Sequence, residues 1–284
     1  MKTKTVEQFL GFWALRGCMA FVTVILFVVF WDIITKGTPA VTWEFLTQSP
    51  REGMTKGGIF PAIVGTFLVT MITAVLAVPL GMGSAIYLNE YASDNWLTRF
   101  IRMSIRNLSG VPSIVYGLFG VALFVEACHF GTSILSAGCT LGLMTLPLTI
   151  TASEEALKAV PRAYREGALA LGATRWQAIR TNVLPYSIPG MLTGAILGLS
   201  RAAGETAPIL FTGAAFALPE LPGSIMSQFM ALPYHLYIMS TQHHNITLVR
   251  PIAYGTALVL LMLILLVNMS AIILRYRLRQ MKKE

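Results

Sequence analysis

The chain has 284 residues, of which 55% are hydrophobic and only 12% are charged. That charged share is about half the share usual for a soluble domain. A soluble core cannot hide so much apolar surface, so the composition excludes an ordinary soluble protein and predicts a membrane protein. The length fits one membrane domain, and the formal net charge is +8.

Six segments are apolar and long enough to cross a bilayer, whose core of about 30 Å requires about 20 apolar residues of a helix. The sequence therefore predicts an all-α integral membrane protein with six transmembrane helices. The first segment runs into Trp31-Asp32 without a small-residue cleavage site, so we expect it to be retained rather than removed as a signal peptide. The six expected spans are 17–34, 62–87, 110–127, 132–152, 187–211 and 251–273.

The basic residues are distributed unevenly between the two sides of these spans. The N-terminus, the loops 88–106 and 153–185, and the C-terminal tail share one side and carry most of the 21 Lys and Arg residues. By the positive-inside rule this side is cytoplasmic, so both termini are expected in the cytoplasm. Topology then explains the net charge, and no nucleic acid partner is needed. The basic residues of the two ends are Lys2, Lys4, Arg16, Arg275, Arg277, Arg279, Lys282 and Lys283.

The other side carries a long loop, about 212–249, in which we expect short helices lying against the outer surface. Three histidines lie in or after this loop: His235, His243 and His244. No carboxylate cluster accompanies them as in a metal site, so we expect these histidines to face solvent. Cys128 and Cys139 could pair near this side, but the sequence favours small buried hydrophobic roles for the cysteines.

The loop 153–185 has the signals of two short helices joined by a turn. Pro161 interrupts the first helical stretch, and Gly172 supplies a residue that can take positive φ. Thr174 with Gln177 matches a capping box, which predicts the start of a second helix. Three residues of this hairpin have short side chains, so that another protein could approach its backbone closely: Ala168, Ala170 and Ala173.

The fifth expected span carries a positive and a negative charge, Arg201 and Glu205, four residues apart. On a helix these side chains are neighbours and can pair. An arginine at a bilayer centre costs about 2.5–3.5 kcal/mol even on the gentler scale, so the pair needs a reason. It either holds two subunits in register or offers Arg201 to a crossing oxyanion, with Thr206 beside the path. A ladder on the same helix permits close helix approach: Gly190, Gly194 and Gly198.

The loop 153–185 resembles the EAA loop of ABC-importer permeases, whose pattern is E-A-A, three residues, G, nine residues, I, one residue, L-P. Glu166, Gly172 and Leu184-Pro185 stand at the matching spacing, whereas Gly167 replaces Ala and Asn182 replaces Ile. In that family the loop docks into a groove on a separate ATPase subunit. The residues of the implied ATPase coupling site are Glu166, Gly167, Ala168, Gly172, Ala173, Thr174 and Arg175. We expect Leu184-Pro185 to end the second helix of the loop.

Three further stretches resemble PstA-type permeases of phosphate importers: "GGIFPAIVGT", "SGVPSIVYGLFG" and "SRAAGETAP". The resemblance implies a type I ABC-importer permease fold over a core of residues 57–284, with residues 1–56 adding a first span and an outer loop. It implies a subunit that forms half of a phosphate path in a bacterial inner membrane. The implied partners are a homologous sister permease (PstC type), two copies of an ATPase subunit (PstB type), an extracytoplasmic phosphate-binding protein (PstS type) and membrane lipid.

The sequence contains no G-x-x-x-x-G-K-[ST] motif, so ATP and Mg²⁺ are expected to be used by the partner ATPase. We expect this chain to bind no cofactor or metal and to have no catalytic residue. Within ABC importers, the alternative substrates are sulfate, molybdate and phosphonate. A secondary anion carrier is a weaker alternative, because such carriers show internal repeats and the sequence has no clear repeat.

Overall fold

The structure is a computed structural model, and it describes residues 2–280. Lys282 and Lys283 lie outside the described residues, as do the side chains of Lys2, Lys4 and Arg279. Apart from one short hairpin and an isolated bridge, the regular secondary structure of the described residues is helical. It contains five helices long and apolar enough to cross a membrane, or six if one bent helix pair counts as a single span. The predicted all-helical membrane fold is confirmed.

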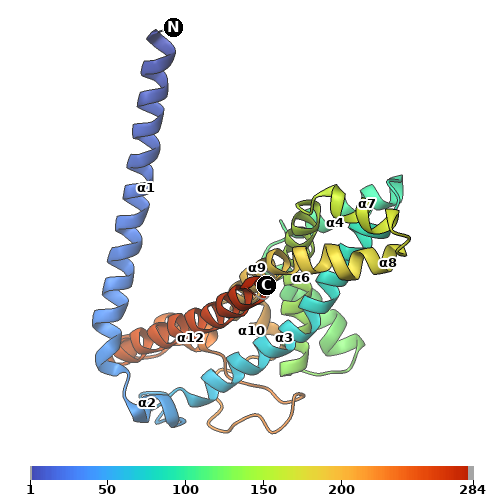
Figure 1. The fold of residues 1–284 in the computed structure, drawn as a ribbon. Helices are drawn as coiled ribbons and strands as arrows, with labels where there is room; N and C mark the ends of the chain where they lie inside the picture. The colour runs from blue at the N-terminus through green and yellow to red at the C-terminus, as the bar shows by residue number, and fades with distance from the viewer. Residues whose placement is uncertain (1, 281–284) are drawn as a thin grey trace.

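The N-terminal half consists of α1 (Lys2–Gly37), the short helices η1 (Thr38–Ala40) and α2 (Trp43–Thr47), and an antiparallel hairpin of β1 (Pro50–Arg51) and β2 (Lys56–Gly57). It continues with α3 (Phe60–Ile86), the π-helical turn η2 (Tyr87–Tyr91), α4 (Trp96–Leu108), α5 (Ser113–Gly120) and the π-helical η3 (Val121–Ala127). α1 stands away from the rest and meets it mainly at α12 (Figure 1).

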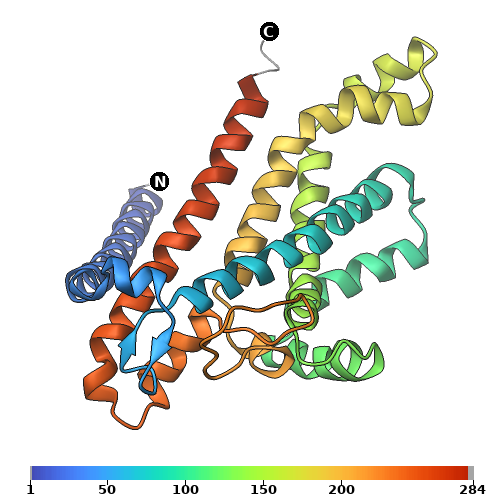
Figure 2. The same cartoon turned by 90° about the horizontal axis from the view of Figure 1, so that it is seen from below.

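The C-terminal half consists of α6 (Ile134–Lys158), α7 (Arg162–Ala170), α8 (Arg175–Ala178), the π-helical η4 (Ile179–Val183) and α9 (Leu184–Ala203). It ends with α10 (Ala207–Thr212), α11 (Leu232–Thr241) and α12 (Ile246–Gln280). Figure 2 shows α12 and α9 running side by side, with the hairpin and the irregular segment before α11 gathered at one end.

Four of the six expected spans match helices that could cross a membrane: Gly11–Ala40, Phe60–Tyr91, Ile134–Lys158 and Ile246–Arg277. Three of these helices contain the expected span, and Ile134–Lys158 begins two residues after the start of the expected span 132–152. The third expected span, 110–127, differs: α5 and η3 form a qualifying span only together with α4, from which they are bent by 106°. The physical reason is Pro112, which stands at the N-cap of α5 and cannot continue α4.

The fifth expected span, 187–211, is also placed differently. Its helix begins at Arg175, passes through η4 without a stop, and ends at Ala203. The expectation that Leu184-Pro185 ends a helix is therefore wrong. Pro185 has no backbone N–H to donate, and it directly follows the π-helical turn η4, whose hydrogen-bond pattern already departs from that of an α-helix, so the helix runs on through the proline. Residues 204–206 then break the helix before α10.

The interior is built around α6, which packs between α3 and α9. The glycine ladder faces α6: a Cβ on Gly190 would contact Ala156, and a Cβ on Gly194 would overlap the side chain of Ala152. Gly198 continues the ladder beside Thr149. The prediction of close helix approach is confirmed, and the helix that approaches belongs to the same chain.

Most of the segment before α11 lies on the surface as expected, but its last residues do not. The run 229–232 is almost completely buried, and α11 buries His235, which is 2% exposed. His243 is 6% exposed and its Nε2 lies 3.0 Å from the Gly53 carbonyl oxygen, so only His244 of the three histidines is exposed as expected. Apolar neighbours such as Leu232 and Met239 explain the difference, because they draw the whole element into the core.

The cysteines also differ from expectation. Cys18 and Cys128 are exposed, Cys139 is half-buried, and all three are free. A thiol behaves as a small hydrophobic group, so a cysteine that faces lipid needs no hydrogen-bond partner.

Candidate functional site

The helix–turn–helix of residues 153–185 forms as the sequence predicts. α7 ends in a Schellman motif, in which the Ala173 N–H donates to the Ala168 carbonyl at 3.1 Å and the Gly172 N–H donates to the Leu169 carbonyl at 3.0 Å. Gly172 has φ +84°, which explains why glycine occupies this position. Thr174 then caps α8 in a complete capping box with Gln177. These local signals fix the hairpin that α7 and α8 form.

The candidate coupling residues lie together on this hairpin and most of them are exposed. The exposed ones are Glu166, Gly167, Gly172, Thr174 and Arg175, whereas Ala168 and Ala173 are half-buried. Two exposed apolar side chains beside them were not predicted: Leu171, 90% exposed, and Trp176, 52% exposed. The sequence feature that could have identified them is a large apolar residue within a polar loop, because exposed apolar patches often mark protein contacts.

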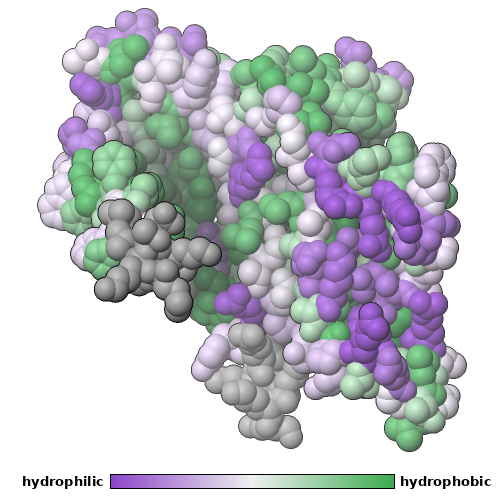
Figure 3. All heavy atoms as spheres, turned by 90° about the horizontal axis from the view of Figure 1, so that it is seen from above, coloured by the Kyte–Doolittle hydropathy of each residue, from purple (hydrophilic) through white to green (hydrophobic). Residues whose placement is uncertain are grey.

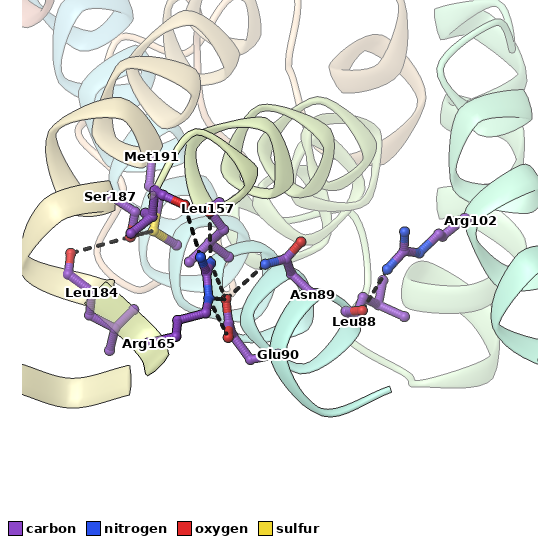
Figure 4. Close-up of polar contacts among 10 residues, drawn as sticks. Leu88, Asn89, Glu90, Arg102, Leu157, Arg165, Leu184, Ser187 and Met191 are labelled. Atoms are coloured by element: carbon purple, nitrogen blue, oxygen red, sulfur yellow. Dashed lines mark hydrogen bonds and ion pairs between the residues drawn. The ribbon is translucent and has the colours of Figure 1, made fainter. Parts of the chain in front are cut away.

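Hydrophilic side chains also gather around this hairpin. In Figure 3 they cover the right-hand part of the face, where α4, α7 and α8 lie in Figure 1. The same part of the molecule contains the ion pair between Arg165 Nη2 and Glu90 Oε1 at 2.7 Å, drawn in Figure 4. A second pair joins Arg102 Nε to Glu154 Oε1 at 3.6 Å. Sequence reasoning counted both arginines only as topology signals and missed their acidic partners.

The second candidate site is the charged pair near the end of α9. Arg201 Nε donates to Glu205 Oε1 at 3.2 Å, so the predicted pairing is present. Arg201 lies in the last turn of α9 rather than at mid-helix, and its side chain is 58% exposed. Within the single chain, the Arg201 side chain is therefore not covered by protein. Glu205 is 17% exposed and lies in the break before α10, next to the half-buried Thr206.

The fold brings two of the quoted sequence stretches together at this break. α5, from the stretch 109–120, packs on α10, which begins in the stretch 200–208. A Cβ on Gly117 would lie 3.0 Å from the Phe211 ring and 3.1 Å from the Pro208 Cα, so glycine permits the contact. Arg201, in the last turn of α9, thus lies close to the place where the short helices α5 and α10 pack together. A break in the backbone at membrane depth is tolerated where it is buried in protein or lines an aqueous path.

The chemistry available at this site is anion binding. A guanidinium is permanently charged and can offer two parallel N–H donors to an oxyanion. Within the described residues, no group of three His, Cys, Asp or Glu side chains is arranged to hold a metal ion. No pairing of Arg201 with an acid other than Glu205 occurs among the described residues.

The model of the family described as "Binding-protein-dependent transport system inner membrane component" matches residues 77–283. The chain is 34% identical over 266 residues to the probable ABC transporter permease protein YqgI of Bacillus subtilis, covering 89% of this chain and 90% of YqgI. It is 33% identical over 253 residues to the phosphate transport system permease protein PstA 1 of Mycobacterium tuberculosis, covering 87% of this chain and 81% of that protein.

Solved structures of bacterial importers share the fold. An ABC transporter that imports the acidic polysaccharide alginate superposes with a TM-score of 0.65 at 14% identity, over 93% of this chain and 95% of that one. The MetNI methionine ABC transporter gives a TM-score of 0.62 at 17% identity, over 78% and 97%. Permeases of this kind work with an ATPase and a binding protein. The chain therefore belongs to the family of binding-protein-dependent inner-membrane permeases, and it is a non-catalytic, multi-pass permease subunit of an ABC importer.

Proposed function

We propose that this permease imports phosphate and that Arg201 lines the path of the anion. The observation that carries the proposal is the half-exposed guanidinium of Arg201, held at a helix break by a single carboxylate 3.2 Å away. An exposed pair of this kind can exchange its partner, so Glu205 holds Arg201 while the path is empty and yields it to phosphate. The phosphate permease of Mycobacterium tuberculosis, 33% identical, supports phosphate over other oxyanions.

The proposed assembly follows from the surfaces that the single chain leaves open. The apolar window of α1 has none of its residues buried, and α1 contacts mainly α12. A homologous sister permease of PstC type would cover α1 and complete the path opposite Arg201. Two PstB-type ATPase copies would dock at the hairpin of α7 and α8 and at its counterpart in the sister. A PstS-type binding protein would dock on the other face, with both termini of this chain in the cytoplasm.

In this cycle, ATP binding closes the ATPases and moves the hairpin around Glu166–Arg175. The movement opens the path to the outside, where the binding protein delivers phosphate to Arg201. ATP hydrolysis then resets the inward-facing state. No bond in phosphate breaks in this subunit, because its role is to bind the anion and let it pass.

The test is uptake of radiolabelled phosphate by vesicles containing the complete importer, with Arg201→Ala and Arg201→Lys variants. We expect Arg201→Ala to abolish uptake while the complex assembles and the binding protein still stimulates ATP hydrolysis. Arg201→Lys should retain part of the uptake, because charge remains but bidentate geometry is lost. Lys56→Ala is the matched control, since Lys56 forms an exposed pair with Glu52 at the same four-residue spacing.

Normal uptake by Arg201→Ala would contradict the proposal. Loss of the assembled complex in both variants would instead make the pair a structural contact between subunits. Competition with sulfate, molybdate and phosphonate separates the alternative substrates. If one of these anions is the true substrate, it should block uptake of labelled phosphate at a lower concentration than unlabelled phosphate does. Uptake that persists without ATP would indicate a secondary carrier.

A further inference from the structure

Arg165 uses its whole guanidinium to join three parts of the chain. Its Nε and Nη2 donate to the two carboxylate oxygens of Glu90 at 3.1 and 2.7 Å. Its Nη2 and Nη1 also donate to the carbonyls of Leu157 and Val160, each at 2.9 Å. The side chains of Glu90 and Arg165 are only 7% and 23% exposed. Asn89 adds a further donor to Glu90 at 2.8 Å, so the network is well satisfied (Figure 4).

The positions of these residues link the coupling hairpin to α3. Arg165 lies in α7 directly before Glu166, the first residue of the coupling pattern. Glu90 lies in η2, the wide turn that ends α3. Two more arginines reach the same turn, from α4 and from α8. Arg102 Nη2 donates to the Leu88 carbonyl at 2.6 Å, and the Arg175 guanidinium lies 5.3 Å from the centre of the Tyr91 ring.

We call the contacts of Arg102, Arg165 and Arg175 with residues 87–91 the η2 junction. Cations from three separate helices converge there on one π-helical turn. Turns of this type interrupt regular helix geometry and are frequent at functional sites. Breaking a buried ion pair by removing one partner leaves an uncompensated charge, so the Glu90–Arg165 contact resists separation. A displacement of α7 therefore pulls on the end of α3.

Near its opposite end, α3 packs against the residues that precede α11 and against the first residue of α11. Thr66 Oγ1 accepts from the Leu232 backbone N–H at 2.8 Å. Gly65 lies against the Met230 carbonyl so closely that a Cβ would overlap it. Phe229, Met230 and Leu232 are at most 1% exposed. α3 has 27 residues and a rise of 1.5 Å per residue, so it spans about 40 Å between its two anchored ends.

We infer that the Glu90–Arg165 pair is the positioning contact that makes α3 move with the ATPase-facing hairpin. Through it, motion at α7 reaches the buried segment 229–232 at the other face of the subunit. Glu90 and Arg165 touch neither substrate nor nucleotide in this arrangement; they act by holding α7 on α3. The inference rests on the proposed coupling role of the hairpin, and it adds a route of transmission that does not pass through α9 and Arg201.

The experiment compares wild type, Glu90→Gln, Arg165→Gln and the double variant in the complete importer, reconstituted in vesicles. Uptake of inorganic phosphate and ATP hydrolysis are measured together, with and without the binding protein. Coupling free energies between sites are typically 1–3 kcal/mol, which corresponds to about 5–150-fold. We therefore expect the phosphate taken up per ATP hydrolysed to fall at least about fivefold in each single variant. In the double variant, the phosphate taken up per ATP hydrolysed should be no lower than in the more impaired single variant, because both substitutions remove the same contact.

Asp94→Asn is the matched control. It removes the charge of Asp94 from the Asp94–Arg99 pair at 2.9 Å, in which both side chains are exposed and neither belongs to the η2 junction. The control should keep the wild-type ratio. Arg165→Lys keeps the charge but not the fork of donors, so it should give a ratio between wild type and Arg165→Gln.

A second readout follows α3 without relying on the substrate. A fluorophore at Leu80→Cys, an exposed position of α3, is introduced after Cys18, Cys128 and Cys139 are replaced by serine. Addition of ATP with vanadate should change the fluorescence of this label when Glu90 is present. The same addition should leave the fluorescence unchanged in the Glu90→Gln variant. An unchanged uptake ratio or an unchanged vanadate response in Glu90→Gln would overturn the inference. Failure of both Glu90→Gln and Arg165→Lys to assemble would overturn it as well, because the pair would then be only structural.

The two proposals can fail separately. If phosphate is not the substrate, wild type shows no phosphate uptake, yet the vanadate response of the α3 label still tests the junction. If the η2 junction does not transmit motion from α7 to α3, Arg201 variants still lose phosphate uptake, whereas Glu90→Gln keeps it.

Discussion

His235 is buried in α11 with both ring nitrogens lacking a hydrogen-bond partner among the described residues. The pKa of this histidine is lowered from 6.5 to about 4, because burial disfavours the charged imidazolium. The side chain is therefore neutral in the folded protein at neutral pH. Its apolar surroundings, which include Leu232 and Ile238, give a proton no compensating carboxylate among the described contacts.

The pH dependence of stability follows from this shift. Between pH 6.5 and about 4 the unfolded state binds more protons at this site, so stability is present above that window and falls as the pH is lowered through it. The loss amounts to at most about 3 kcal/mol. Thermal unfolding of the purified permease at pH 7.5 and 4.5 measures it. His235→Phe should flatten the pH dependence, whereas His244→Phe, at an exposed position, should not. Equal slopes in wild type and His235→Phe would refute this account.

At the scale of elements, α6 and α9 are joined by the glycine ladder rather than by polar contacts. Interdigitation at Gly190 and Gly194 lets the backbones approach closely, which replaces the hydrophobic effect that is absent between helices in lipid. Two polar contacts join α9 to α12: Ser200 Oγ contacts Asn268 Oδ1, and Arg275 Nη1 donates to Thr193 Oγ1 at 2.9 Å. The two faces of α9 thus bind two different helices by two different means.

Gly194→Ala should weaken the α6–α9 contact. The added Cβ overlaps the side chain of Ala152, and overpacking a tight core typically costs about 1–3 kcal/mol. We expect a lower melting temperature of the permease in detergent. Gly83→Ala is the control, because no atom lies within 4 Å of its Cβ and alanine favours the helix. A melting temperature for Gly194→Ala equal to that of Gly83→Ala would contradict the tight packing.

The elements that sequence predicted correctly are those set by local chemistry. The Gly172 turn and the Thr174–Gln177 capping box depend on residues within one or two turns, so they can be read without the fold. The 106° bend at Pro112 and the helix break after Ala203 were not predicted in their extent, because a proline marks where a helix can stop, whereas the angle between the pieces also depends on contacts distant in sequence, such as that of α5 with α10. Glu90 was missed as the partner of Arg165 because 75 residues separate them in the chain.

At the scale of the whole molecule, α1 contributes no residue to the three hydrophobic clusters of the described chain. Its attachment is polar at one end, where Asp32 Oδ2 accepts from the Tyr254 hydroxyl at 3.0 Å. Exposed aromatic residues, among them Phe27 and Trp31, cover its length. Such a helix has the composition of a subunit or lipid contact rather than of a core element.

A variant lacking residues 1–30 tests this division. We expect the remaining core to keep the melting temperature of the full chain, because the three clusters are intact. Co-purification with the sister permease should fall sharply, because α1 is the extended surface that a second subunit would cover. Recovery of the sister at the full-chain level would show that α1 meets only lipid. Full-chain protein carrying Trp43→Ala, an exposed aromatic change outside α1, serves as the control.

Leu171, 90% exposed at the tip of the hairpin, and Trp176 beside it have a consequence for how the cell makes this protein. If the hairpin faces the cytoplasm and docks the ATPase as proposed, a copy inserted in the membrane before its ATPase arrives would display these apolar side chains to cytoplasmic chaperones and proteases. Surveillance of that kind degrades orphaned subunits, so the supply of ATPase would set the number of importers and keep unpaired permease scarce. A pulse-chase in cells lacking the ATPase should then show a shortened half-life, and Trp176→Ser should lengthen it.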